Sequence, residues 1–133
     1  MKTVDVVAPP TDQVGTHRSF VRALSTGDLD AATACFARDG CLITPDATAV
    51  HGRERIRPLL AQLIAAHTEI RVDLSNVLTA AGVVLACERW TVRSEGADGD
   101  RVERTLEPTL VLREVEGEWK LAIVAPWGWG GRL

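Results

Sequence analysis

Apolar residues in the first half of the chain recur every three or four positions, which is the spacing of an amphipathic helix. The first such segment starts at Thr11, a residue type that caps helix N-termini, and stops at Gly27. Asp28 can cap a second helix immediately afterwards, so we expect a helical hairpin with a very short link. A third helix is expected over residues 53–67, with a kink or offset of its first turn at Pro58.

The stretches between and after these helices predict strands. The second helix is expected to carry its apolar stripe as far as Phe36, and a short strand at residues 40–44 should follow and stop at Pro45. Further strands are expected at residues 70–74, 83–92, 102–115 and 119–125, joined by turns. Helices first and an antiparallel meander afterwards is the pattern of an α+β domain.

The strand at 83–92 starts with residues that are apolar on both faces. A sheet with one face in water would alternate apolar and polar positions, so this strand should be covered on both sides. Helices can cover one face, and a second copy of the chain is the economical cover for the other. We therefore expect a homodimer. The alternative is a sheet curled strongly enough to bury both faces by itself.

Five segments resemble the nuclear transport factor 2-like superfamily, and in particular its SnoaL-like and ketosteroid isomerase-like branches. They span about residues 12–128 in the expected order: 20–30 (FVRALSTGDLD), 35–40 (CFARDG), 52–57 (GRERIR), 110–113 (LVLR) and 117–121 (GEWKL). Each segment alone is weak, whereas together they are specific for a fold and poor at naming a function. The resemblance implies an α+β cone, in which a curved antiparallel sheet wraps around three N-terminal helices and a pocket opens between them. It also implies dimerisation through the outer sheet face.

Composition limits the classes of protein that fit. A length of 133 residues with 46% hydrophobic and 25% charged residues is typical of one soluble globular domain. We assign that domain to residues 11–133 and a loose arm to residues 1–10, whose acid and two prolines do not fit a signal peptide. The net charge of −3 gives no footprint for nucleic acid, and no apolar run reaches the roughly 18 residues of a membrane span. These features predict a cytoplasmic protein that binds neither nucleic acid nor membranes.

Neither the cysteines nor the histidines are spaced as metal ligands. Cys35, Cys41 and Cys87 are an odd number without a C-x-x-C pair, so they are interpreted as small buried residues. The three histidines do not cluster, although His17 shares the apolar stripe of the first helix and could face into the cone. We predict no metal and no cofactor.

The catalytic groups of the ketosteroid isomerases are missing at the positions that the resemblance assigns to them. That mechanism uses an Asp base, with a Tyr and a protonated Asp that stabilise an enolate oxygen. The Tyr position falls on Phe20, and the chain contains no Tyr at all. The base position falls on Thr44, whose hydroxyl cannot act unaided as a base near neutral pH, and the second Asp position falls near Pro108 or Thr109. The isomerase mechanism is therefore not expected.

Three carboxylates could serve instead as a general acid or base: Asp46, Glu88 and Glu107. Asp46 is better explained as part of a solvated turn, whereas Glu107 either replaces the missing acid or points to the outer face. Glu88 and Arg89 interrupt an apolar strand, and because neighbours on a strand point to opposite faces, only one of them can face the interior. The alternative is a cross-strand ion pair that only fixes the register.

A mainly apolar pocket for a small organic molecule is expected inside the cone. We predict that it is lined by Phe20, Thr44, Leu60, Trp90, Thr109, Ile123 and Trp127. Two functions stay open. One is a catalytically silent domain that binds a small apolar ligand, which the missing catalytic groups favour. The other is a general acid–base enzyme, such as a cyclase, isomerase or dehydratase, acting on a polyketide-like or steroid-like substrate.

Overall fold

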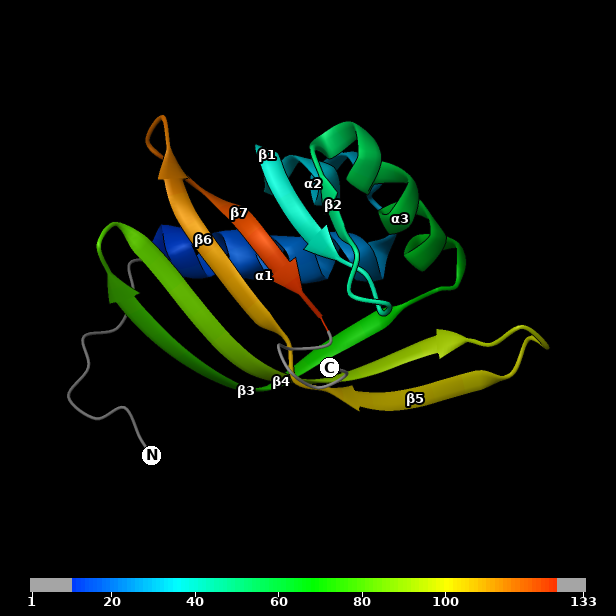
Figure 1. Ribbon diagram of the computed structural model, residues 1–133. Coiled ribbons are helices and arrows are strands. Elements are labelled where there is room, and N and C mark those ends of the chain that lie inside the picture. Colours follow the sequence, from blue (N-terminus) through cyan, green and yellow to red (C-terminus); the bar gives the residue numbers. More distant parts are fainter. Residues whose placement is uncertain (1–10, 127–133) are drawn as a thin grey trace.

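Three helices pack against one side of a curved sheet (Figure 1). The computed structural model describes residues 11–126. Its helices are α1 (Thr11–Thr26), α2 (Leu29–Ala34) and α3 (Arg53–Ala65). The predicted hairpin is present, and Asp28 caps α2 by accepting a hydrogen bond from the backbone N–H of Ala31 (3.1 Å). No helix among these residues is long and apolar enough to cross a membrane.

The sheet consists of β1 (Phe36–Ile43), β2 (Ala49–His51), β3 (Glu69–Ala80), β4 (Val83–Glu95), β5 (Arg101–Leu106), β6 (Thr109–Val115) and β7 (Glu118–Ala125). The strand order is β2-β1-β7-β6-β4-β3, with β5 paired to β4. Figure 1 shows the sheet curving around the helices, which confirms the α+β class. The strands after α3 pair antiparallel with one another, as the predicted meander requires. β1 lies outside that meander and pairs with β7 in parallel, because a long crossover rather than a hairpin joins these two strands.

The predicted strand at 102–115 is broken at Pro108 into β5 and β6. Proline has no backbone N–H and cannot donate to a sheet ladder. β4 therefore changes its partner along its length: residues 83–87 pair with β6, and residues 90–95 pair with β5. At the junction, the backbone N–H of Glu88 donates to the carbonyl of Pro108 (3.0 Å).

β1 begins at Phe36, earlier than predicted, and α2 is correspondingly short. The early start depends on Gly40, where the register between β1 and β7 is irregular. A side chain at this position would meet the carbonyl oxygens of Ala37 and Leu121 at 3.0 Å, so only glycine fits without a backbone shift. Phe36 consequently joins the core as part of the sheet, and not as part of a helix.

The hydrophobic core lies between the helices and the inner face of the sheet, which is the face turned toward them. Phe20 of α1 packs edge to face against Phe36 of β1, with ring centroids 5.5 Å apart. Ile56 and Leu60 of α3 are fully buried. Most of the sheet's contribution comes from Leu42, Val84, Ala86, Trp90, Leu110, Leu112, Leu121 and Val124.

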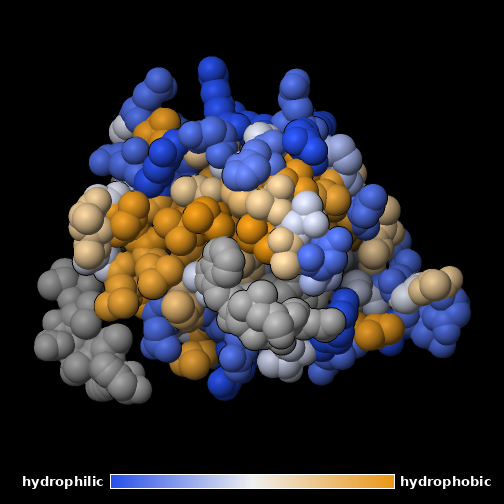
Figure 2. All heavy atoms as spheres, in the orientation of Figure 1, coloured by the Kyte–Doolittle hydropathy of each residue, from blue (hydrophilic) through white to orange (hydrophobic). Residues whose placement is uncertain are grey.

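The outer face of the sheet, turned away from the helices, has an apolar part and a polar part. Leu74, Leu78 and Val83 leave 45%, 59% and 38% of their surface exposed. Figure 2, which views this face, shows apolar residues gathered over β4 and β6. The apolar part named here, Leu74, Leu78 and Val83, is called the outer apolar patch below.

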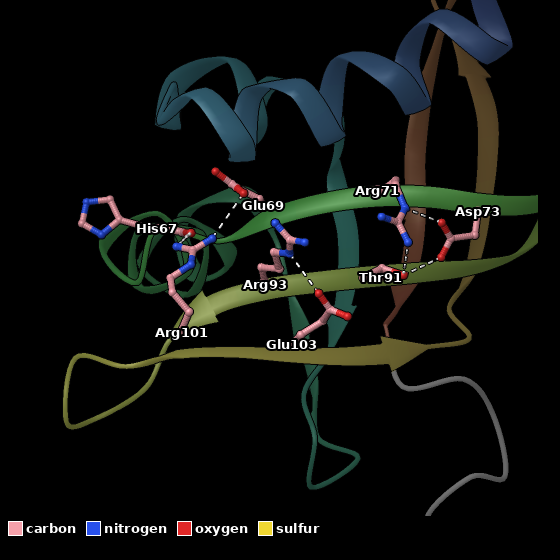
Figure 3. A network of polar contacts seen from close by, with 8 residues as sticks. All are labelled: His67, Glu69, Arg71, Asp73, Thr91, Arg93, Arg101 and Glu103. Atoms are coloured by element: carbon pink, nitrogen blue, oxygen red, sulfur yellow. Dashed lines mark hydrogen bonds and ion pairs between the residues drawn. The ribbon is translucent and has the colours of Figure 1, made fainter.

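Polar side chains cover the outer face along β3, β4 and β5 (Figure 3). The Oγ1 of Thr91 donates to Oδ2 of Asp73 (2.6 Å) and accepts a hydrogen bond from Nη2 of Arg71 (3.1 Å). These donors lower the pKa of the Asp73 carboxyl, with the Thr91 hydroxyl contributing most. An ion pair between Arg93 and Glu103 (2.9 Å) follows further along the strands. Glu103 therefore pairs across the strands with Arg93 rather than with Arg89.

Candidate functional site

An apolar cavity of about 100 Å³ lies between α1, α3 and the inner face of the sheet. Three of the predicted lining residues, Phe20, Leu60 and Trp90, belong to its wall. The wall also contains Leu24, Leu42, Leu63, Thr68, Ile70, Val92, Ser94, Arg104, Leu106, Val124 and Pro126. All but three of these side chains are apolar.

The other predicted lining residues lie elsewhere. Thr44 belongs to the turn between β1 and β2, where its backbone N–H donates to the carbonyl of Thr48 (2.9 Å). Thr109 and Ile123 lie on the outer face, because the residues next to them along β6 and β7 are core residues that point inward. Trp127 lies outside the described residues.

Of the three candidate carboxylates, Glu88 is the one that enters the interior. Its side chain is fully buried on the inner face of β4. The indole Nε1 of Trp90 donates to Oε1 (2.7 Å), and the hydroxyl of Ser75 on β3 donates to Oε2 (2.8 Å). Arg89 points the other way, with 51% of its side chain exposed. The choice that the strand pattern left open is thus decided in favour of Glu88.

His17, on α1, lies against the same carboxylate. Its Nε2 is buried and lies 2.8 Å from Oε1 of Glu88, an ion-pair distance without the geometry of a hydrogen bond. The side chain as a whole keeps 13% of its surface exposed. An imidazole against a fixed carboxylate is a pair of groups that can hold or pass a proton.

Trp90 connects this cluster to the cavity. One part of its side chain lines the cavity, while its Nε1 holds Glu88. Glu88 and His17 do not themselves line the cavity, so the indole ring of Trp90 would lie between them and a ligand in the cavity. The ring orientation, and with it one wall of the cavity, depends on the carboxylate behind it.

Asp46 and Glu107 do not border the cavity. Asp46 lies in the exposed turn after β1, where hydrogen bonds from Thr44 and Thr48 lower the pKa of its carboxyl. Glu107 leaves 71% of its side chain exposed and lies 3.6 Å from Nη2 of Arg89. The geometry favours the solvated-turn interpretation for Asp46 and the outward-pointing interpretation for Glu107.

Two polar residues near the candidate site escaped the sequence analysis, the exposed Ser75 and the buried Thr68. Ser75 faces Glu88 because the register of β3 against β4 shifts between Val72 and Leu74, and such a bulge has no signal in the sequence. Thr68 lies between α3 and β3 and lines the cavity with a buried side chain. Within the described part of the chain, no group of three His, Cys, Asp or Glu side chains could hold a metal ion.

A search of curated protein sequences gave no match. Solved structures with the same fold include a protein proposed to be a dehydratase of the NTF2-like family from Streptomyces avermitilis, with 19% identity, a TM-score of 0.76 and coverage of 89% of this chain and 96% of that chain. An uncharacterised protein with a cystatin-like fold from Caulobacter vibrioides has 19% identity, a TM-score of 0.75 and coverage of 86% of both chains. A ketosteroid isomerase-like protein from Erwinia carotovora atroseptica has 17% identity, a TM-score of 0.73 and coverage of 86% and 92%.

At these identities the structures show the fold alone. The family comes from the sequence, since the model of the SnoaL-like domain matches residues 17–120. That match spans more than half of the chain and includes most of α1, all of α3 and strands β1 to β6, together with the first three residues of β7. The chain therefore belongs to the SnoaL-like domain family.

Proposed function

We propose that this domain binds a small apolar molecule in the cavity between α1, α3 and the inner face of the sheet. The observation that carries the proposal is the wall itself, which is apolar except for Thr68, Ser94 and Arg104. A volume of about 100 Å³ is of the order that suits a single small ring, and it is below the roughly 300 Å³ at which pockets for drug-sized ligands begin. Fused-ring ligands would require the walls to move apart.

The test is a titration of the protein with toluene, followed by the backbone amide signals in NMR. We expect saturable shifts confined to residues around the cavity, such as Ile70 and Val92. The variant Ser94→Phe places a ring at the cavity wall and should abolish binding. Thr105→Phe is the matched control, because Thr105 lies on the outer face of the neighbouring strand β5 and should leave binding intact. Absence of saturable shifts in the wild-type protein would overturn the proposal.

A second candidate function is general acid–base catalysis, which the buried Glu88 favours. Its contacts with Trp90 and His17 place a proton-holding pair behind the cavity wall. A small cyclic ketone is a suitable probe, since Glu88 would exchange the protons next to its carbonyl once the Trp90 ring moves aside. We expect faster exchange of cyclohexanone protons in D₂O with the wild-type protein than with Glu88→Gln. Equal rates for the two proteins at saturating ketone would argue against catalysis by this pair.

We also propose that the chain forms a homodimer through the outer face of its sheet. The outer apolar patch supports this, because three large aliphatic side chains on neighbouring strands lie in water in the single chain. Leu78→Lys should convert a dimer into a monomer in sedimentation equilibrium. Val102→Lys changes another exposed aliphatic residue, which lies on β5, outside both the patch and the cavity wall, and should leave the dimer intact. A wild-type protein that sediments as a monomer at micromolar concentration would refute the dimer.

A further inference from the structure

Thr68 is a buried polar residue in the cavity wall whose hydroxyl has no partner. It follows α3 directly, and its backbone N–H donates to the carbonyl of Leu63 (3.1 Å), which holds the residue in place. Only 3% of the residue is exposed, and Oγ1 makes no hydrogen bond. The side chain lines the cavity together with Leu63 and Ile70.

The three other buried polar residues among residues 15–126 are hydrogen-bonded, and the buried Nε2 of His17, which makes no hydrogen bond either, has the carboxylate of Glu88 as its ion-pair partner. Thr33 donates to the carbonyl of Leu29 (2.8 Å), Thr91 donates to Asp73, and Glu88 accepts from Trp90. This is the usual condition of a buried polar group, because leaving one unpaired costs free energy. An unpaired hydroxyl in the wall of a cavity therefore points to a hydrogen-bonding partner inside that cavity.

We propose that Thr68 selects a ligand that carries one hydrogen-bonding oxygen on a small, uncharged ring. The inference rests on the proposed binding of an apolar molecule in the cavity, and it names the polar atom of that molecule. A threonine hydroxyl can both donate and accept, so a phenol or a cyclic ketone would satisfy it. A charged ligand fits less well, because most of the surrounding wall is apolar and would not repay the loss of hydration.

The volume of the cavity sets the size of this ligand. About 100 Å³ leaves room for one ring with a small substituent, and the oxygen must then point toward the end of α3, where Thr68 lies. The ring would contact Phe20 and Trp90 on the opposite parts of the wall. Thr68 is therefore a specificity-determining residue, and this role does not require Glu88.

The experiment compares phenol with toluene, two ligands that differ by a hydroxyl against a methyl group. Dissociation constants are measured by NMR titration for the wild type, for the isosteric variant Thr68→Val and for Thr68→Ser, which keeps the hydroxyl. The preference for phenol over toluene should fall about tenfold in Thr68→Val and be retained in Thr68→Ser. Thr105→Val, on the exposed outer face of β5, is the control and should leave the preference unchanged.

The outcomes separate this inference from the proposal on which it rests. If both ligands bind and the preference is the same in Thr68→Val, the role of Thr68 is overturned and the apolar binding site stands. If benzoate binds more tightly than phenol, the ligand is charged and the inference is wrong. If no ligand binds, the proposed function falls and the inference falls with it. A lower melting temperature of ligand-free Thr68→Val would also contradict it, since removing an unpaired hydroxyl should not destabilise the protein.

Discussion

Nε2 of His17 lies 2.8 Å from Oε1 of Glu88, so the first helix and the fourth strand meet at a buried carboxylate. The same carboxylate accepts hydrogen bonds from Trp90 and Ser75, which lie on β4 and β3. The first helix and the β3–β4 hairpin, which are far apart in the sequence, therefore converge on one carboxylate inside the domain. Replacing Glu88 should therefore lower the free energy of unfolding, whatever the role of the residue in function.

Replacing Glu88 by Leu removes the acceptor of the buried Trp90 indole N–H and of the Ser75 hydroxyl, and also the ion-pair partner of His17. We expect the free energy of unfolding to fall by about 3 kcal/mol, the upper end of the cost of leaving a buried polar group unpaired, because more than one group loses its partner. Glu88→Gln should cost about 1 kcal/mol, because the amide oxygen still accepts from Trp90. Urea denaturation measures both. The control is Glu107→Gln, which changes an exposed carboxylate and should be neutral; equal losses in all three variants would contradict the assignment.

The carboxyl of Asp73 should contribute to acid sensitivity. Hydrogen bonds from Thr91 and then Arg71 hold its pKa in the folded state below its usual value. Between the two pKa values the unfolded chain binds more protons, so the stabilisation is present above about pH 4 and is lost as the pH falls. Thr91→Val removes the larger cause and should make stability fall less steeply as the pH drops below about 4. Urea midpoints measured at several pH values test this, and an unchanged slope would contradict it; Thr105→Val serves as the control.

A methyl group at Gly40 should be costly, whereas one at Gly15 should not. The Cβ of Gly40→Ala would lie 3.0 Å from two backbone oxygens that cannot easily move, so we expect a loss of about 1–3 kcal/mol. Gly15 lies in α1 with nothing within 4 Å of such a Cβ. Gly15→Ala should stabilise the protein by up to about 1 kcal/mol, because alanine favours helix. Thermal unfolding of the two variants checks the opposite signs, and shifts of the same sign would refute the close approach at Gly40.

The three thiols should react at different rates with a disulfide reagent such as DTNB. Burial raises the pKa of the Cys35 thiol and of the Cys41 thiol, and both side chains are shielded, whereas Cys87 is exposed on the outer face. Cys87 should be labelled first, and Cys87→Ser should remove the fast phase while Cys41→Ser keeps it. If the outer face is a dimer interface, labelling of Cys87 should slow as the protein concentration rises. Rapid labelling of Cys35 in the folded protein would contradict its burial.

The sequence predicted the helical hairpin, the third helix and the α+β class, because capping residues and apolar spacing act over a few neighbours. It also marked Glu88 as a carboxylate in an otherwise apolar strand. It placed Phe36 in the wrong element, since the pairing of the first half of β1 with β7 involves a close approach of the backbones at Gly40, which no local pattern shows. It likewise joined β5 to β6, because the effect of Pro108 depends on which strand lies beside it.

Within the candidate site, the sequence by itself determined which residue types are available: no tyrosine, few histidines and a small set of carboxylates. Only the tertiary structure decided which of these residues face the interior and which of them contact one another. Strand alternation allowed either Glu88 or Arg89 to face inward, and the register of β3 and β6 on β4 chose Glu88. Contacts such as that between His17 and Glu88, and the unpaired hydroxyl of Thr68, arise only when distant segments pack together. Local sequence patterns do not determine such contacts, because the contacts depend on how all the side chains of the core pack together.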